Sequence, residues 1–182
     1  MSSALKAAEL GQPGDQVPGK FSTRYKLSKK AVRELMQEVS SSLGNPPMNW
    51  EDVEEAKAEE YTVYFDSGMP CLARVNGALI PTLQCLLKRG FSWLPYVVVD
   101  RGATQALGRG ADLMAPGIRR VSGSFKEGAI VAIVDEQSNV PVCVGRALKD
   151  SNTIDSMAKG KVKGKVIENV HYPGDGLWKL IS

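Results

Sequence analysis

Residues 97–118 decide the fold of the second half of the chain and read Val-Val-Val-Asp-Arg-Gly-Ala-Thr-Gln-Ala-Leu-Gly-Arg-Gly-Ala-Asp-Leu-Met-Ala-Pro-Gly-Ile. The three β-branched valines at the start predict a short buried strand. Asp100 follows directly and is well placed as an N-cap, so residues 102–107 fit a helix of about two turns. The stretch therefore predicts a strand that leads without a loop into a short helix.

Glycine interrupts that helix twice, at Gly108 and Gly110 on either side of Arg109. Because glycine adopts positive φ without strain, we expect both glycines to do so and to let the backbone approach a ligand while Arg109 projects outward. Residues 113–118 then return as a strand, which the Pro116–Gly117 pair bends near an edge or a bulge. This pattern predicts a surface that grips a ligand and contains no evident catalytic group.

The composition is typical of a globular protein, with 182 residues, 43% of them hydrophobic and 24% charged. This length allows one domain or two small ones. The net charge of +3 is too small to indicate a nucleic-acid partner by itself. However, residues 97–182 hold 12 Lys/Arg against 9 Asp/Glu, whereas residues 21–60 hold 6 against 8. We therefore expect the C-terminal half to face an anion.

The three cysteines, Cys71, Cys85 and Cys143, are far apart, and no Cys-x-x-Cys pair occurs. This spacing supports neither a disulfide framework nor a zinc site, so we expect no metal and no cofactor. No run of about 18 apolar residues predicts a membrane span, and the first residues lack the apolar core of a signal peptide. The expected location is the cytoplasm, without a membrane partner.

The first 96 residues divide into a tail and a small α+β domain. Residues 1–20 are rich in Ser, Gly, Pro and Gln and predict a flexible tail. We expect the domain to span residues 21–96 and to begin with a helix over 29–40 that Ser28 caps. The core face of this helix has four apolar residues at helical spacing: Val32, Leu35, Met36 and Val39.

The rest of this first domain alternates between strands and turns. Strands are expected at 61–65 and 69–75, and Asn76-Gly77 is a hairpin signal after the second strand. A helix over 82–89 follows, and Pro95 marks the boundary to the second domain, residues 97–182.

Basic residues gather just before and along the first helix, and we call them the N-terminal basic cluster: Arg24, Lys26, Lys29, Lys30 and Arg33. Two interpretations stay open, a solvated helix face and a secondary contact with phosphates. Residues 51–60 hold six acidic residues and one lysine. Because this segment would repel nucleic acid, we expect it to face away from any such partner.

The second domain is predicted as a compact β-barrel-like unit. Residues 128–135 and 141–148 predict a hairpin, and 151–159 a helix capped by Ser151 or Asn152. Two further strands are expected at 166–172 and 177–181. Between the helix and these strands lies a glycine-flanked lysine loop with four lysines: Lys159, Lys161, Lys163 and Lys165.

The sequence offers no positive support for catalysis, and we expect no enzyme. His171 is the only histidine and is interpreted as a strand residue. Gly108 and Gly110 lack the third glycine of a dinucleotide-binding motif, because Leu113 occupies its position. The glycines of 160–165 have three residues between them where a P-loop has four, and Val166 replaces the Ser or Thr that holds magnesium.

What remains are four arginines around the glycines, the lysine loop and an aromatic residue near the end: Arg101, Arg109, Arg119, Arg120 and Trp178. Arginine forms bidentate contacts with phosphate, and exposed aromatic rings stack on bases. The alternative for Trp178 is plain core packing at the end of the barrel. Leu107, Leu113 and Met114 are expected in the core.

Four motifs carry a resemblance to a known family: Val-Asp-Arg-Gly-Ala at 99–103, Gly-Ala-Asp-Leu-Met-Ala-Pro-Gly-Ile at 110–118, Val-Gly at 144–145 and Ile-Glu-Asn-Val-His-Tyr-Pro-Gly-Asp-Gly-Leu-Trp at 167–178. They resemble PUA domains, the RNA-binding modules of pseudouridine synthases and archaeosine transglycosylases. The chain is most similar to translation-associated proteins of the malignant T-cell amplified sequence type, in which a pre-PUA domain precedes the PUA domain. The segment Arg24-Tyr-Lys-Leu-Ser-Lys-Lys resembles the archaeal members.

This resemblance implies an α+β chain whose PUA pseudo-barrel holds structured RNA, such as a tRNA acceptor end or small-subunit ribosomal RNA. With the arginines above, the expected RNA contacts are Arg101, Gly102, Ala103, Arg109, Gly110, Ala111, Asp112, Leu113, Met114, Pro116, Arg119, Arg120, Trp178 and Lys179. The N-terminal basic cluster is the expected secondary patch.

The primary functional hypothesis is a non-catalytic RNA-binding protein of the translation apparatus that contacts the small ribosomal subunit. The alternatives are an RNA-targeting subunit for a modification enzyme acting in trans, and a protein-interaction adaptor. The sequence does not identify a protein partner. Eukaryotic members of the family bind the density-regulated protein, but the archaeal start of the first helix does not carry that partner over to this chain.

Overall fold

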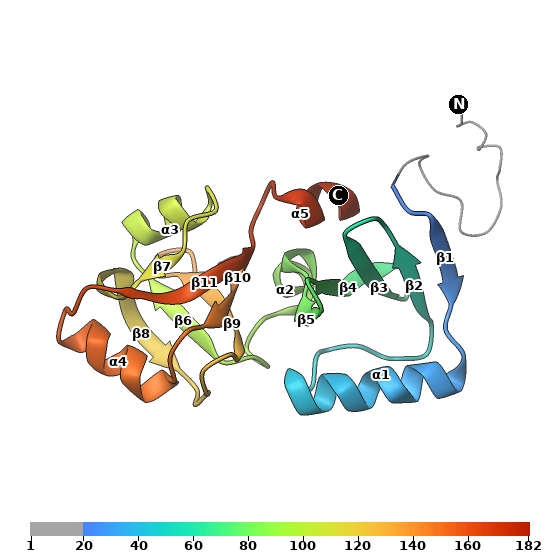
Figure 1. Cartoon of the computed structure of the whole chain (residues 1–182), viewed down its shortest axis with the longest axis horizontal. Coiled ribbons are helices and arrows are strands. Elements are labelled where there is room, and N and C mark those ends of the chain that lie inside the picture. Colours follow the sequence, from blue (N-terminus) through green and yellow to red (C-terminus); the bar gives the residue numbers. More distant parts are fainter. Residues whose placement is uncertain (1–19) are drawn as a thin grey trace.

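The computed structural model of the protein describes residues 20–182 (Figure 1). The tail expected over residues 1–20 lies outside these residues, except for Lys20. Within the described residues, the first half forms a five-stranded sheet and two helices. Its elements are β1 (Thr23–Lys26), α1 (Lys29–Ser42), β2 (Val53–Lys57), β3 (Tyr61–Asp66), β4 (Met69–Val75), β5 (Ala78–Pro81) and α2 (Leu83–Arg89).

The first sheet is an antiparallel meander in the order β1-β2-β3-β4-β5. The hairpin turn between β4 and β5 is formed as expected, with positive φ at Asn76 (51°) and Gly77 (81°). Ser28 caps α1, because its Oγ accepts from the Ala31 N–H at 3.1 Å. Leu35 is buried on the core face of α1, but Met36, also expected there, is 39% exposed.

The second half forms a six-stranded sheet in the order β7-β11-β10-β9-β6-β8. Only the β6–β9 pair is parallel among the pairs of this sheet. Its elements are β6 (Tyr96–Val99), α3 (Arg101–Leu107), β7 (Leu113–Met114), the 3-10 turn η1 (Ala115–Gly117), β8 (Ile118–Ser122), β9 (Ile130–Asp135), β10 (Pro141–Ala147), α4 (Ser151–Lys159), β11 (Lys165–His171) and α5 (Gly176–Ile181).

The η1 turn closes the second sheet into a pseudo-barrel. It joins β7 to β8, which are the two edge strands of the sheet, so the edges come together around one core. The expected single strand over 113–118 is therefore wrong. The Ala-Pro-Gly sequence of η1 forms a tight turn in which the chain leaves β11 and crosses to β6.

The end of the chain differs from its predicted strand. Residues 176–181 form the helix α5, because the Asp175 carboxylate caps it and accepts from the Trp178 N–H at 2.8 Å. An apolar run this short fits a strand and a buried helix equally well, so its periodicity does not distinguish between the two structures. The helix α4 is also capped differently, by Asp150, whose carboxylate accepts from the Thr153 N–H, and not by Ser151 or Asn152.

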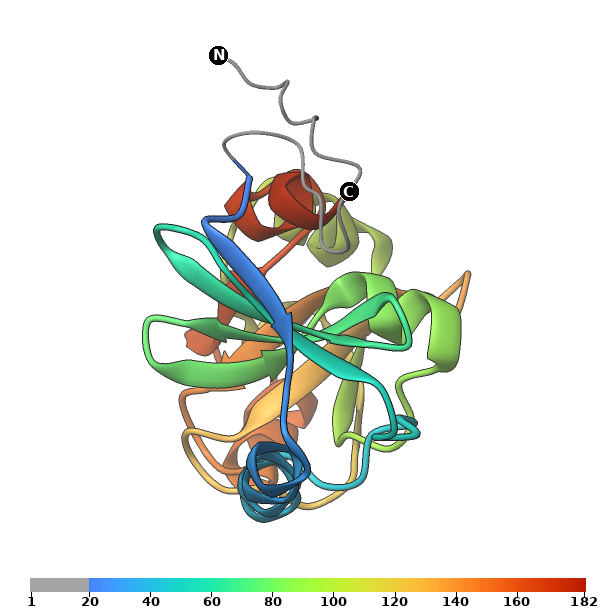
Figure 2. The ribbon, with the colours of Figure 1, turned by 90° about the vertical axis from the view of Figure 1, so that its right-hand side faces the viewer.

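The two halves share a hydrophobic core. Residues of the second sheet pack with the first domain, and α5 contributes the buried Leu177 to the same core. The division into residues 21–96 and 97–182 stays a prediction. The helix α5 belongs to the second range in sequence but packs on the core of the first. Figures 1 and 2 show α3 and α5 along one side of the molecule, and α1 and α4 along the opposite side. None of the helices in residues 20–182 has the length and apolar character to cross a membrane.

Candidate nucleic-acid interface

The helix α3 is fixed at its first turn and at its middle by contacts that its sequence provides. The Asp100 carboxylate accepts from the Ala103 N–H at 2.8 Å and caps the helix as expected. The Thr104 hydroxyl donates to Asp135 at 2.7 Å and ties α3 to the end of β9. A Cβ at Gly117 would lie 2.8 Å from the Ala103 methyl group, so glycine at this position lets η1 lie against α3.

The glycine loop, residues 108–112, follows α3 and is only partly as expected. Gly110 has the predicted positive φ of 95°, whereas Gly108 has a helical φ of −65° and simply ends the helix. A Cβ at Gly110 would lie 2.8 Å from Cζ of Tyr172. Gly110 is therefore required twice, for its φ and for the close contact with the Tyr172 ring.

Asn169 of β11 holds the glycine loop against the sheet. Its side-chain N–H groups donate to the backbone carbonyls of Leu107 and Ala111, both at 3.0 Å. Its backbone N–H donates to the Asp112 carboxylate at 2.8 Å, and Lys165 Nζ lies 3.2 Å from the same carboxylate. These contacts, the Asn169 N–H first, hold the pKa of Asp112 below its usual range. The loop is thus clamped on β11 at three points.

Asn169 is a structural residue of the site that sequence reasoning missed. It lies in the motif at 167–178, but its partners are backbone carbonyls 58 and 62 residues earlier in the chain. No local pattern signals such contacts. Asp112, an expected RNA contact, is also engaged in holding the loop.

The four candidate arginines are not equivalent. Arg101 and Arg109 are exposed, and neither forms an ion pair within residues 20–182. Arg119 is exposed and lies 3.4 Å from Glu136. The Arg120 guanidinium lies over the Tyr96 ring, 5.7 Å from its centroid. Tyr96 is the first residue of β6, three residues before the end of the strand that leads into α3, a separation of roughly 10 Å at ~3.3 Å per residue. The structure therefore places Arg101 at the start of α3 and Arg109 in the glycine loop after it, whereas Arg120 contacts Tyr96.

The apolar members of the expected site separate into core and surface. Leu113 is 1% exposed and packs inside the barrel, as expected for a core residue. Met114 was expected in the core but is 48% exposed. Pro116 and Ala111 are exposed beside it, and Gly102 and Ala103 lie on α3. The face around the glycine loop is therefore partly apolar.

Trp178 and Lys179 lie on the helix α5 and not on a final barrel strand. Trp178 is partly buried, as the packing interpretation expects, but against the core cluster of the first domain and not at the end of the barrel. Lys179 is exposed. His171 is buried at the end of β11, as expected for a strand residue, with its Nδ1 atom 3.0 Å from the Asp175 carboxylate.

The lysine loop lies beside β7 and adds cations to this part of the surface. The Ala115 N–H donates to the Gly164 carbonyl at 2.9 Å, and Lys165 pairs with Met114 in register. Lys161 and Lys163 are exposed and form no ion pair with the residues that the structure describes. The long-range pairing of β7 with β11 creates this neighbourhood, which the lysine spacing alone does not reveal.

Comparison with known proteins agrees with this architecture. The family model "PUA domain" matches residues 95–172, and the model "Domain of unknown function (DUF1947)" matches residues 23–89. An uncharacterized protein of Methanocaldococcus jannaschii is 37% identical over 165 residues, which cover 86% of this chain and 96% of that protein. The chain belongs to the PUA-domain family, with a DUF1947 region before the PUA domain.

Solved and eukaryotic relatives extend the comparison. The crystal structure of a PUA domain from Aeropyrum pernix K1, described as a tartrate complex, is 36% identical, with a TM-score of 0.81 over 87% of this chain and 90% of that chain. Malignant T-cell-amplified sequence 1-B of Xenopus laevis is 36% identical over 58% of this chain. Translation machinery-associated protein 20 of Schizosaccharomyces pombe is 34% identical over 58%. The matches span 57% and 58% of these two relatives.

The N-terminal basic cluster lies apart from the PUA glycine loop. Arg24 Nε donates to Glu54 at 2.7 Å, and its guanidinium lies over the Phe65 ring at 3.9 Å. Lys26 lies 3.9 Å from Asp52. The other three members, Lys29, Lys30 and Arg33, are exposed on α1, on the side of the molecule opposite α3 (Figures 1 and 2). The structure does not bring this cluster and the glycine loop into one surface.

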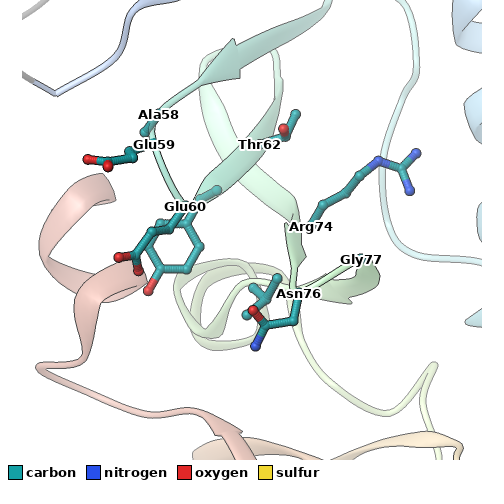
Figure 3. Close-up of a pocket in the computed structure, with 9 residues that line it drawn as sticks. Ala58, Glu59, Glu60, Thr62, Arg74, Asn76 and Gly77 are labelled. Carbon is teal, nitrogen blue, oxygen red and sulfur yellow. The ribbon is translucent and has the colours of Figure 1, made fainter.

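The acidic segment borders a hollow of about 440 Å³ in the first domain. Figure 3 shows Glu59 and Glu60 on one side of it, with Arg74 and Asn76 on the other. The Arg74 guanidinium already forms a bidentate pair with Glu38, at 2.7 and 2.6 Å. Because its cation is paired and its carboxylates are exposed, this hollow disfavours phosphate.

Proposed function

We propose that this protein is a non-catalytic, cytoplasmic RNA-binding protein of the translation apparatus. It binds structured RNA, a tRNA acceptor end or small-subunit ribosomal RNA, through α3 and the glycine loop. The observation that carries this proposal is the pair Arg101 and Arg109. Both are exposed and without an ion pair in the described part of the chain. Arg101 begins α3, and Arg109 lies in the glycine loop that Asn169 and Tyr172 hold in place.

The physical chemistry of this surface suits RNA phosphates. Arginine donates paired hydrogen bonds to phosphate oxygens, and a contact that needs no ion pair to be broken keeps its full Coulomb gain. Lys161 and Lys163 add exposed cations in the loop beside β7, and the exposed Met114 of β7 offers an apolar contact for a base or sugar.

Support for a role in translation comes from the names of the relatives. One of them is called a translation machinery-associated protein, and the match covers a little over half of it. The role of the whole relative therefore comes to this chain as a proposal. In the alternative, the same surface delivers RNA to a modification enzyme acting in trans.

Binding to purified tRNA and to small-subunit ribosomal RNA tests the proposal. The triple variant Arg101→Ala/Arg109→Ala/Arg119→Ala should bind at least about 30-fold more weakly than the wild type. The matched control Lys126→Ala/Lys149→Ala/Lys88→Ala removes three exposed cations elsewhere and should bind nearly normally. Equal binding by the wild type and the arginine variant contradicts the site. Co-purification with a modifying enzyme that needs this chain for activity would favour the alternative role.

A further inference from the structure

The turn after β11 joins the two halves of the protein. Residues 172–175 connect the end of β11 to the start of α5 on the first domain (Figure 1). The Asp175 N–H donates to the Tyr172 carbonyl at 3.2 Å, and Gly174 has a φ of 90°, as the third residue of a type II turn requires. Tyr172 packs against the barrel core, whereas Leu177 is buried in the core cluster of the first domain. The turn therefore has one end in each half of the molecule.

The Asp175 carboxylate fastens both ends of this turn. Its Oδ2 atom accepts from the Tyr172 N–H at 3.0 Å, and its Oδ1 atom accepts from the Trp178 N–H at 2.8 Å. Nδ1 of the buried His171 lies 3.0 Å from the same Oδ2 atom. Hydrogen bonds to a charged acceptor are stronger than those between neutral groups, and the Asp175 side chain is only 14% exposed to competing water. One carboxylate thus ties the end of β11 to the first turn of α5.

The helix α5 is fixed on the first domain from its first residue. A Cβ at Gly176 would lie 2.5 Å from the hydroxyl oxygen of Tyr61 in β3, so glycine lets α5 begin against that side chain. Trp178 packs on the same core cluster that contains the buried Leu177. Because Asp175 caps this docked helix, the first domain helps to set the position of its carboxylate.

Tyr172 connects this carboxylate to the glycine loop. The ring of Tyr172 lies against Gly110, since a Cβ there would be 2.8 Å from Cζ and 2.9 Å from the hydroxyl oxygen. Gly110 has the positive φ that redirects the loop, and Arg109 directly precedes it. A shift of the Tyr172 ring would therefore release the segment that carries Arg109.

We propose that Asp175 is a positioning residue for the RNA site, which links the docking of α5 on the first domain to the shape of the glycine loop. This inference rests on the proposed RNA-binding function and gives the first domain a part in it. Asn169 holds the loop from within the second sheet, whereas Tyr172 and Asp175 hold it from a helix that is anchored on the first domain. A change in the docking of α5 therefore changes the affinity for RNA, as a coupling free energy between the two places.

Hydrogen exchange in the full chain tests the link without any RNA. The amides of Gly110 and Ala111 donate to the carbonyls of Leu107 and Ala106, so their exchange rates report opening of the loop. Asp175→Asn keeps the shape of the side chain but removes its charge, and both amides should exchange at least about tenfold faster. The matched control is Asp150→Asn, which makes the same change at the cap of α4 and should leave both rates unchanged.

RNA binding by the same two variants tests the consequence for the site. Each variant adds one positive charge, which by itself favours RNA. Asp175→Asn should nevertheless bind purified tRNA about fivefold more weakly than the wild type, because the loop is no longer held in shape. Its salt dependence should stay unchanged, since no phosphate contact is lost. Asp150→Asn should bind as tightly as the wild type or slightly more tightly.

Two variants of Tyr172 complete the test, also in case Asp175→Asn does not fold. Tyr172→Leu removes the ring and should loosen the loop and weaken RNA binding, whereas Tyr172→Phe keeps the ring and should restore both. Unchanged loop exchange in Asp175→Asn and Tyr172→Leu overturns the proposal, and so does faster exchange with normal RNA affinity. If the wild type itself binds no RNA, the proposed function fails, and the exchange rates alone confirm or overturn the link between α5 and the loop.

Discussion

The glycine loop and the N-terminal basic cluster look alike in sequence, since both place several cations near a helix. In the structure they differ in what those cations contact. Arg24 is paired with Glu54 of the neighbouring strand β2, and Lys26 lies near Asp52, just before that strand. Arg101 and Arg109 have no acidic partner in the described part of the chain; Arg101 begins α3, and Arg109 lies in the clamped glycine loop. Lys29, Lys30 and Arg33 on α1 are as exposed and as free of ion pairs in the described residues as the two arginines are, but no fixed loop lies beside them. The comparison teaches that neither a count of cations nor their lack of partners marks an anion site without a fixed backbone beside them.

Charge reversal should give the largest effect and separates the two regions directly. Arg101→Glu/Arg109→Glu should lower the affinity for structured RNA by about 100-fold, because two phosphate contacts become repulsive. Lys29→Glu/Lys30→Glu makes the same change in net charge on α1 and should cost no more than about fivefold, through long-range repulsion alone. Filter binding at one salt concentration measures both. Similar losses in the two variants would mean that net charge, and not the glycine loop, governs binding.

Loss of the loop geometry should have the next largest effect. Gly110→Ala adds a methyl group that contacts the Tyr172 ring and imposes a φ that alanine disfavours. We expect a stability loss of about 1–2 kcal/mol and about tenfold weaker RNA binding. The control Gly77→Ala imposes similar strain in a hairpin away from α3, where a Cβ meets no atom within 4 Å. It should lose stability in thermal unfolding but keep RNA affinity, and a loss of affinity there would argue against a local grip.

Removal of a paired cation should affect stability more than binding. Arg24→Ala breaks the Glu54 ion pair and the contact with the Phe65 ring, so unfolding in urea should show a loss of about 1 kcal/mol. RNA affinity should stay within about twofold of the wild type, since this guanidinium already has its partners. A large loss of affinity without a loss of stability would show that the cluster touches RNA after all.

The smallest effect should come from the pH dependence of the loop clamp. The Asp112 carboxylate has a lowered pKa in the folded protein, caused first by the Asn169 N–H and then by Lys165. A lowered pKa stabilises the fold above the unfolded value of ~3.9, and this contribution is lost as the pH falls through the folded value. Asp112→Asn should therefore flatten the decline of stability below about pH 4. An unchanged acid limb of the stability curve would show that this carboxylate does not clamp the loop.

Local features of the fold could be predicted from the sequence, because their causes lie within a few residues. Ser28 and Asp100 cap the helices that they precede, and Asn76-Gly77 forms the expected hairpin turn. The motifs at 99–103 and 110–118 indicated the family correctly. In each case the side chain or the backbone preference acts on the residues next to it.

Features that depend on distant partners could not be predicted. The final apolar run forms the helix α5 on the first domain, a packing surface that its own periodicity does not contain, although the cap at Asp175 is a local signal that the strand prediction missed. The Asn169 clamp joins residues that are about 60 positions apart. Arg24 of β1 meets Glu54 of β2 because the sheet places the two strands side by side. For the same reason, the sequence indicated the arginines of the site but not that Arg119 lies near Glu136 and Arg120 over Tyr96.

The salt dependence of RNA binding tests the central claim most directly. The logarithm of the affinity for one structured RNA is plotted against the logarithm of the salt concentration, for the wild type, Arg101→Ala/Arg109→Ala and Lys29→Ala/Lys30→Ala. Each lost phosphate contact reduces the slope by about 0.7–0.9. The account predicts a slope shallower by about 1.5 for the arginine variant and an unchanged slope for the lysine variant. An unchanged slope for the arginine variant, with a shallower one for the lysine variant, would contradict it.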